Sequence, residues 1–233
     1  MTQRARVAGI PLLPSRFRPT ALIVVAACAL IVTVLGAHFH GESAAGRLDA
    51  AVARHLPGVG SQAGSDLAAS ADLGSPLPAT VLTAVLCYCC LALRRYRGAI
   101  MVAVSVPAAA ALTEYVLKPL IHRTISGFPS MPSGHETTAF AIVACVVVLL
   151  VNPPGRVAPA SLRLVLAFCA VAVGGGVALG LVIAHAHYFT DTIAGAAVGT
   201  GVALIAALVL DAAGRRAPAR ASSAAPAQDT RVP

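Results

Sequence analysis

The chain has 233 residues, of which 58% are hydrophobic and only 11% are charged, and its formal net charge is +8. This composition excludes an ordinary soluble globular domain and a charge-rich disordered chain. We therefore expect an all-α, polytopic membrane protein whose apolar helices form one bundle.

Six apolar segments approach or reach the length of about 20 residues that a helix needs to cross the hydrocarbon core of a membrane. They cover residues 20–37, 76–93, 98–117, 135–151, 162–184 and 190–210. Pro107 and the small residues of the third to fifth segments favour close helix contacts and local bending. The sequence therefore predicts one six-helix membrane domain over residues 20–210 rather than two domains.

Three parts of the chain lie outside the predicted spans. Residues 1–19 form a basic cytoplasmic leader, and the apolar run after it lacks a convincing cleavage site, so we expect an uncleaved anchor. In the connection 38–75, Leu48, Val52 and Leu56 recur at four-residue spacing among charged residues, which predicts a short interfacial helix. The tail 211–233 is rich in Ala, Pro, Ser and Arg without periodicity, and we expect it to be disordered.

The basic residues predict the orientation of the bundle, because Lys and Arg in short loops are retained in the cytoplasm. Almost all of them precede the first span, follow the sixth, or lie in the links after the second and fourth; the exceptions are Arg47, Arg54, Lys118 and Arg123. We therefore expect both termini in the cytoplasm and the other three connections outside. The net charge follows from this bias and requires no nucleic-acid partner.

Titratable side chains gather at the outer ends of three spans, where they are costly unless they pair or react. Lys118, His122 and Arg123 follow the third span, Pro132-Ser133-Gly134-His135 opens the fourth, and His185, His187 and Asp191 join the fifth to the sixth. The predicted topology brings all three groups to one face of the membrane.

The spacing of His187 and Asp191 predicts a catalytic pair. If residues 187–191 are helical, the Asp191 carboxylate lies beside the His187 ring, where it can fix the tautomer and stabilise the imidazolium. His187 could then act as a nucleophile. His135, at the start of the fourth span, could protonate a leaving oxygen.

The start of the fourth span also predicts a phosphate-binding site. Ser133 and Gly134 allow backbone N–H groups to approach an anion at the positive end of a helix. Lys118, the only lysine of the chain, and Arg123 add cationic donors. His122 and His185 are candidates for an auxiliary role.

These residues resemble the motifs of the type 2 phosphatidic acid phosphatase family, whose members are integral membrane lipid phosphate phosphatases. Pro132-Ser133-Gly134-His135 matches the second motif, and His187 with Asp191 matches the end of the third. The resemblance implies a six-helix core with an extracytoplasmic active site and a reaction that needs neither metal nor cofactor. In that reaction His187 becomes a phosphohistidine, Asp191 orients it and His135 acts as the acid.

The resemblance also implies a lipid phosphate as substrate and membrane lipids as surroundings. A polyprenyl phosphate or diphosphate, a phosphatidic acid type lipid and a prenyl-linked sugar phosphate all fit this class. The Arg-dominated, Ala-rich composition suggests a high-GC bacterium. We therefore expect a multi-pass protein of the plasma membrane with a role in cell-envelope lipid metabolism.

Two phosphate-binding arginines of the family are missing from this chain. Ile125 stands in the place of the arginine of the first motif, of which Lys118 remains, and Leu181 stands in the place of the arginine of the third. A charge-assisted phosphate contact contributes about 1.5–3 kcal/mol. We expect Arg123 to substitute for them, from an outer loop that can fold over the site.

Two other functions remain open. The missing arginines fit a non-catalytic relative that binds or moves lipid phosphates. A metal-dependent membrane hydrolase is the second alternative, since imidazole and carboxylate groups bind zinc or manganese. Its ligands would come from His135, Glu136, His185, His187 and Asp191.

Overall fold

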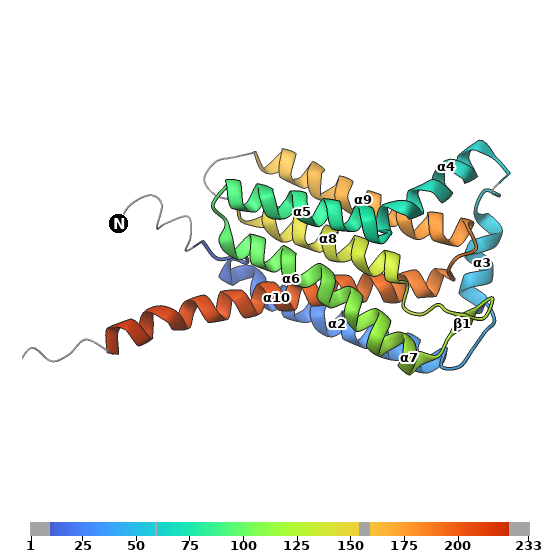
Figure 1. Cartoon of the computed structure of the whole chain (residues 1–233), viewed down its shortest axis with the longest axis horizontal. Helices are drawn as coiled ribbons and strands as arrows, with labels where there is room; N and C mark the ends of the chain where they lie inside the picture. The colour runs from blue at the N-terminus through green and yellow to red at the C-terminus, as the bar shows by residue number, and fades with distance from the viewer. Residues whose placement is uncertain (1–9, 59, 154–158, 224–233) are drawn as a thin grey trace, which may run out of the picture.

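The computed structural model describes residues 10–58, 60–153 and 159–223, with side chains described as far as Arg215. The chain folds into a bundle of helices with a two-stranded hairpin at one end (Figure 1). The longer helices are α2 (Arg18–His38), α5 (Pro76–Ala92), α6 (Tyr96–Leu112), α8 (Gly134–Val151), α9 (Ala160–Ile183) and α10 (Phe189–Ser223). The shorter elements are η1 (Ser15–Phe17), α3 (Arg47–His55), α4 (Gln62–Ser70), η2 (Ala71–Gly74), the π-helical turn η3 (Thr113–Leu117), α7 (Lys118–Ile121), β1 (Thr124–Ile125) and β2 (Phe128–Pro129).

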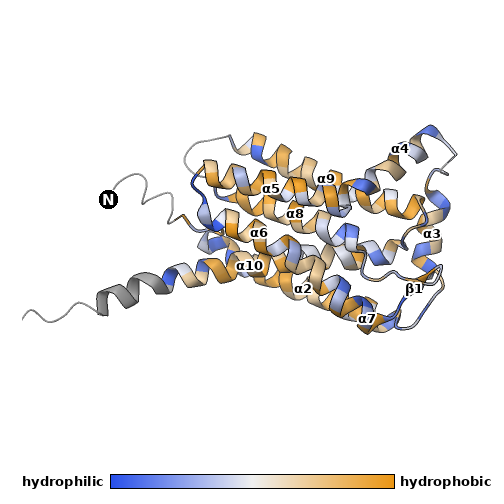
Figure 2. Ribbon diagram, in the orientation of Figure 1, coloured by the Kyte–Doolittle hydropathy of each residue, from blue (hydrophilic) through white to orange (hydrophobic). Residues whose placement is uncertain are grey.

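The prediction of an all-α chain is confirmed, with the small hairpin as its one β element among the described residues. Within the described residues, five helices are long and apolar enough to cross a membrane. A sixth crossing arises if Gln62–Gly74 and Pro76–Ala92, which are bent by 60°, count as one span. Apolar residues cover the shafts of the bundle, whereas polar residues concentrate near its two ends (Figure 2). These features are those of an integral membrane protein.

Helices α8 and α10 form the centre of the bundle. Helix α8 packs against α6, α9 and α10, and α10 also packs against α2 and α6. Glycines allow the backbones of α8 and α10 to approach closely, because a Cβ atom on Gly195 or Gly199 would overlap backbone atoms of α8. The two helices that carry most of the catalytic candidates are therefore held together by direct backbone packing.

The third predicted span is one continuous helix that changes its winding near its end. Helix α6 contains Pro107 without ending there, passes through the π-helical turn η3 and continues as α7 to Ile121. His122, with a φ of 56°, then adopts the left-handed conformation that terminates the helix. The π-helical turn contains Glu114, and its last residue, Leu117, immediately precedes Lys118.

The connection between α2 and α5 contains the predicted short helix, α3, and a second helix that was not predicted. Helix α4 begins after Ser61, whose Oγ accepts a hydrogen bond from the backbone N–H of Gly64 at 3.0 Å. Its small and polar residues give no clear apolar stripe, which explains why the sequence did not reveal it. The location of α3 at a membrane interface stays a prediction.

Helix α10 is longer than the span expected at residues 190–210. We expected an irregular tail from residue 211. The helix instead continues to Ser223, because the Ala-rich and Arg-rich segment has a high helix propensity. The rest of that predicted tail, residues 224–233, lies outside the described residues. The same holds for residues 1–9 of the predicted basic leader.

The first described residues are attached to α10 at the end of the bundle opposite the hairpin. The buried carboxylate of Asp211 accepts hydrogen bonds from the backbone N–H groups of Leu12 and Leu13 at 2.8 and 2.9 Å. Both ends of the described chain consequently lie at one end of the bundle (Figure 1). The hairpin, α3 and α7 lie at the other, which we call the hairpin end.

Candidate active site

Three segments meet at the hairpin end: the η3–α7 segment, the start of α8 and the junction between α9 and α10. The backbone N–H of Ser133 donates to the backbone oxygen of Asp191 at 3.0 Å, which ties the start of α8 to the first turn of α10. His187, Lys118 and Glu114 all lie close enough to His135 to act on its charge. The structure thus brings together predicted residues from all three segments.

His187 lies in a tight turn rather than in a helix. Helix α9 ends in a Schellman motif, in which His185 adopts a left-handed φ of 53° and the N–H of Ala186 donates to the oxygen of Leu181 at 3.0 Å. Helix α10 begins only at Phe189. The helical geometry that we expected for residues 187–191 is therefore wrong, although the turn still brings His187 beside Asp191.

Asp191 is completely buried, and its two carboxylate oxygens have separate partners. Oδ1 accepts a hydrogen bond from Arg123 at 2.6 Å. Oδ2 accepts one from the backbone N–H of Tyr188 at 3.0 Å and lies 3.6 Å from Nδ1 of His187. The last distance exceeds that of a hydrogen bond, but such contacts are often long before substrate binds. The carboxylate faces Nδ1, so Nε2 is the ring nitrogen available for chemistry.

The predicted phosphate-binding turn forms the N-terminus of α8. Ser133 is fully buried, and its Oγ caps the helix by accepting a hydrogen bond from the N–H of Glu136 at 3.4 Å. Gly134 and His135 follow as the first helical residues and are partly exposed. The hydroxyl of Ser133 is thus occupied by the helix, and the backbone at Gly134 and His135 is the part of this turn that remains accessible.

Lys118 is the cation closest to this turn among the predicted residues. Its Nζ donates to Oε1 and Oε2 of Glu114 at 2.7 and 2.9 Å. A Cβ atom on Gly134 would overlap Oε1 of Glu114 and would lie 3.8 Å from Nζ of Lys118. The ion pair therefore rests directly on the first residue of α8, and a side chain at this position would displace the Glu114 carboxylate.

Arg123 lies inside the protein, not in the open loop that we expected. Its side chain is completely buried, and its guanidinium carbon lies 3.8 and 4.3 Å from the ring centroids of Phe39 and Tyr188. The guanidinium donates to Asp191, and to Oδ2 of Asp49 at 2.8 Å. Because two carboxylates already neutralise it, Arg123 is not free to bind a phosphate in this structure.

Asp49 of α3 is a site component that sequence reasoning missed. Its carboxylate is buried and accepts hydrogen bonds from Arg123, from the N–H of Thr190 at 2.8 Å and from the N–H of Gly46 at 2.9 Å. Burial alone would raise the pKa of Asp49, but these hydrogen bonds together lower it below the ordinary value. Asp49 and Thr190 are 141 positions apart, so no local pattern could have revealed their contact.

Comparison with known proteins gives one match. A protein family described as the PAP2 superfamily matches residues 110–215, which include every predicted site residue from Lys118 to Asp191. This match is consistent with a member of the type 2 phosphatidic acid phosphatase family. No curated protein and no solved structure matches the chain. Asp49, which lies before the matched segment, is a contribution of this chain outside the PAP2 region.

The two departures from the PAP2 motif pattern have a structural counterpart. Leu181, in the place of the third-motif arginine, is buried in a cluster with Ala71 and Val177. Ile125, in the place of the first-motif arginine, lies in β1 and is half-buried. Neither position supplies a cation, so Lys118 is the remaining predicted cation that is not enclosed by the protein.

The remaining predicted residues lie at the edge of the site. His185 and His122 are both exposed and adopt the left-handed conformation at helix ends. The ring of His122 stacks on His40 with 5.9 Å between centroids. No hydrogen bond or ion pair joins either histidine to His187 in the described part of the chain. That part also contains no group of three His, Cys, Asp or Glu side chains arranged to hold a metal ion.

The buried network predicts that Asp49 supports both stability and activity. Asp49→Ala would leave Arg123 buried with one carboxylate instead of two, and breaking a buried ion pair costs about 3–5 kcal/mol. We expect a clear decrease in the unfolding temperature of the detergent-solubilised protein, and a lower phosphatase rate because Asp191 loses its fixed position. The measurements are thermal unfolding and phosphate release.

A matched control is Asp66→Ala in the neighbouring helix α4. Asp66 is exposed and accepts a hydrogen bond from Gln62 only, at 2.9 Å, so its removal should change stability by about 0.5 kcal/mol or less. Equal unfolding temperatures for the two variants would contradict the role assigned to Asp49.

Proposed function

We propose that the protein is a membrane phosphatase that hydrolyses a phosphomonoester or diphosphate of a lipid through a phosphohistidine on His187. Membership of the PAP2 superfamily supports a phosphatase-type activity on phosphate esters. The observation that carries the proposal is the arrangement of His187, whose Nδ1 faces the buried Asp191 while its side chain retains 11% exposure. A ring held on one side and accessible on the other is suited to nucleophilic attack.

In the first step, Nε2 of His187 attacks phosphorus and the bond from phosphorus to the lipid oxygen breaks. The negative Asp191 carboxylate stabilises the positive charge that develops on the ring. His135, as the imidazolium, transfers a proton to the departing oxygen. In the second step, water attacks the phosphohistidine, neutral His135 accepts the proton of that water, and the P–N bond breaks to release inorganic phosphate.

The phosphate would lie at the N-terminus of α8. The N–H groups of the first helical turn and the positive end of the helix dipole favour an anion there. Lys118 is the nearest side-chain cation, and Gly134 permits close approach because it has no Cβ atom. Equatorial phosphate oxygens could therefore bind backbone N–H groups and the Lys118 ammonium, without the two arginines that are replaced by Ile125 and Leu181.

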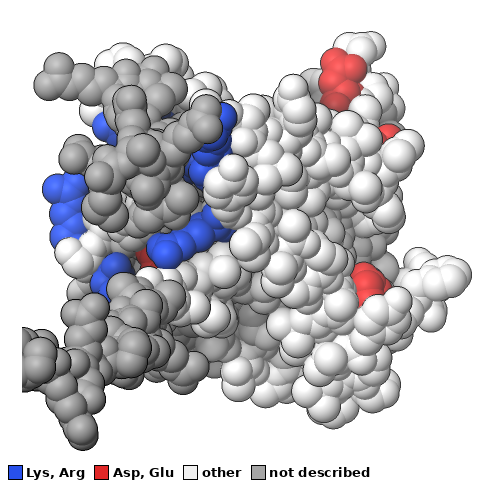
Figure 3. Space-filling view, turned by 60° about the vertical axis from the view of Figure 1, so that its left-hand side comes forward, with Lys and Arg blue, Asp and Glu red and all other residues white. Residues whose placement is uncertain are grey.

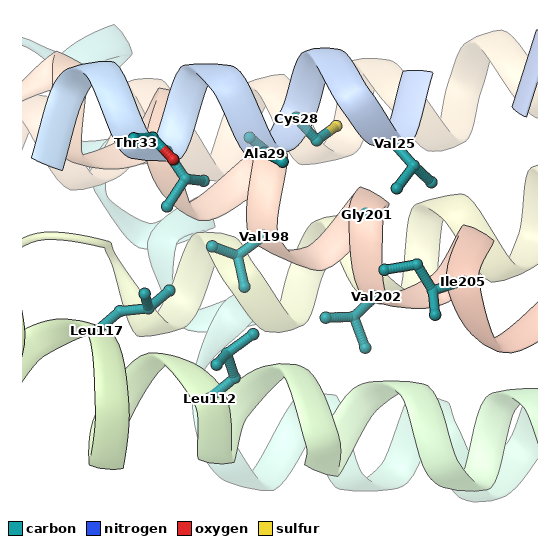
Figure 4. A pocket seen from close by; sticks show the side chains of 12 residues that line it. Val25, Cys28, Ala29, Thr33, Leu112, Leu117, Val198, Gly201, Val202 and Ile205 are labelled. Carbon is teal, nitrogen blue, oxygen red and sulfur yellow. The ribbon is translucent and has the colours of Figure 1, made fainter. Parts of the chain in front are cut away.

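A lipid substrate is supported by an apolar groove between α2, α10 and the segment from α6 to η3. Leu112 and Leu117 line one wall, and residues of α2 and α10 line the others, including Val198 and Val202 (Figure 4). Leu117 immediately precedes Lys118, so a phosphate bound near Lys118 could continue into a hydrocarbon tail along this groove. A polyprenyl, phosphatidic acid type or prenyl-linked sugar phosphate satisfies this requirement.

Positive charge at the termini end supports an orientation with that end in the cytoplasm of a bacterial cell. In the view of Figure 3, arginines gather at the end where the termini lie, and acidic side chains lie mainly toward the other end. Basic residues are retained on the cytoplasmic side, so the site would face outward.

A reporter that is active only outside the cytoplasm should stay silent when fused after residue 233, and a signal there would contradict this orientation.

One specific observation favours a non-catalytic relative as the second candidate. The positions of both phosphate-binding arginines hold apolar residues, Ile125 and Leu181, and Arg123, two residues before Ile125, is paired with two carboxylates. Such a protein would bind lipid phosphates and release them unchanged.

Hydrolysis by purified protein distinguishes these candidates. We expect release of phosphate from a panel of lipid phosphates in the presence of a chelator. His187→Ala should abolish it, because the nucleophile is lost, and His135→Ala should lower it by about 10²–10⁴-fold, the usual contribution of an acid–base group. His55→Ala, in the exposed end of α3, serves as the matched control and should keep full activity. Binding without turnover in the wild-type protein would favour the non-catalytic relative, and inactivation by the chelator would favour a metal-dependent hydrolase.

A further inference from the structure

The Lys118–Glu114 ion pair occupies the place where the substrate phosphate is expected. Both oxygens of Glu114 accept from the Lys118 ammonium, and the carboxylate lies against Gly134 at the N-terminus of α8. The side chain of Glu114 is 45% exposed and that of Lys118 is 15% exposed. The carboxylate is therefore the more exposed partner of this ion pair.

The local winding of the chain contributes to this arrangement. Glu114 lies in the π-helical turn η3 that interrupts the helix from Tyr96 to Ile121. Turns of this kind insert an extra residue into a helix and occur frequently at functional sites. An ordinary ion pair on a helix surface requires neither a π-helical turn nor a facing glycine. Both features are present here, and both concern the position of the Glu114 carboxylate.

The charges around the site do not favour an isolated phosphate dianion. Lys118 is neutralised by Glu114, Arg123 is neutralised by Asp49 and Asp191, and the positions of the two usual arginines are apolar. Asp72 of η2 and Glu114 also lie near His135. A phosphate that takes Lys118 would leave the Glu114 carboxylate unpaired and close to its own negative charge.

We propose that Glu114 is a specificity-determining residue that binds a cationic group next to the substrate phosphate. The preferred substrate class is then a lipid phosphate that carries a primary ammonium within a few bonds of phosphorus. This inference rests on the proposed location of the phosphate at Lys118. On binding, the phosphate replaces Glu114 as the partner of Lys118, and the ammonium replaces Lys118 as the partner of Glu114. Every charge keeps a partner, which a substrate without the cation does not allow.

The test compares two synthetic lipid phosphates that differ in one group. One is a 2-aminoalkyl phosphate and the other is the corresponding 2-hydroxyalkyl phosphate of the same chain length. The interaction of two unit charges about 4 Å apart, even when screened as in water, corresponds to a factor of about five in an equilibrium constant. We therefore expect wild-type protein to prefer the amine by about fivefold or more in kcat/KM.

Glu114→Gln keeps the size of the side chain and removes its charge. This variant should lose the preference for the amine and should act on the hydroxyl compound at a higher kcat/KM than wild type, since Lys118 is released. Glu42→Gln is the matched control, because Glu42 is an exposed carboxylate in the connection before α3. This control variant should leave the kcat/KM values of both compounds unchanged. Equal kcat/KM for the two compounds in wild type, or an undiminished preference in Glu114→Gln, would overturn the proposal.

A binding measurement separates this proposal from the proposed function. The affinities of both compounds are measured in the His187→Ala background, with and without Glu114→Gln, so that turnover is not required. Preferential binding of the amine that disappears with Glu114→Gln supports the role of Glu114, even if the wild-type protein hydrolyses neither compound and the phosphatase function fails. Equal binding of the two compounds, or binding of neither, overturns the role of Glu114, even if the wild-type protein hydrolyses other lipid phosphates.

Discussion

The buried interaction of Arg123 with Asp191 and Asp49 is the constraint on which the geometry of the site depends. A carboxylate removed from water without a partner is strongly destabilising, and Asp191 is completely buried. Arg123 supplies the compensating charge and Asp49 balances it, with Nη2 to Oδ2 at 2.8 Å. Because Asp49 belongs to α3 and Asp191 to α10, one charged network joins the segment between α2 and α5 to the first turn of α10, next to the turn that contains His187.

This network also determines which cation can meet the substrate. The guanidinium of Arg123 lies between two aromatic rings and two carboxylates, so it orients Asp191, and through Asp191 the ring of His187, without contact with phosphate. Lys118 is left as the accessible predicted cation, and it is paired with Glu114. In the proposed mechanism two tasks are separated: the buried Arg123 holds Asp191 beside the nucleophile, and the Lys118–Glu114 ion pair receives the substrate.

Local sequence patterns predicted the elements well and the long-range contacts poorly. Apolar length located the long helices, because membrane spans need continuous apolar residues. The turn from Pro132 to His135 was correctly placed at the start of α8, where Ser133 is the N-cap. The open-loop position predicted for Arg123 was wrong, because its partner Asp49 is distant in the sequence and no local pattern encodes their contact. The conformation of His187 was also wrong, since the Schellman turn at His185 places a left-handed residue where helix spacing was assumed.

Detection of a covalent phosphoryl group on His187 tests the central claim most directly. Wild-type protein mixed with lipid phosphate, quenched within milliseconds in alkali and digested, should yield a peptide that contains His187 with one added phosphoryl group. Phosphohistidine is labile in acid, so mild acid treatment should remove that group. Rapid phosphate release with no phosphorylated His187 peptide at any quench time, or with the phosphoryl group on another residue, would contradict this account of the site.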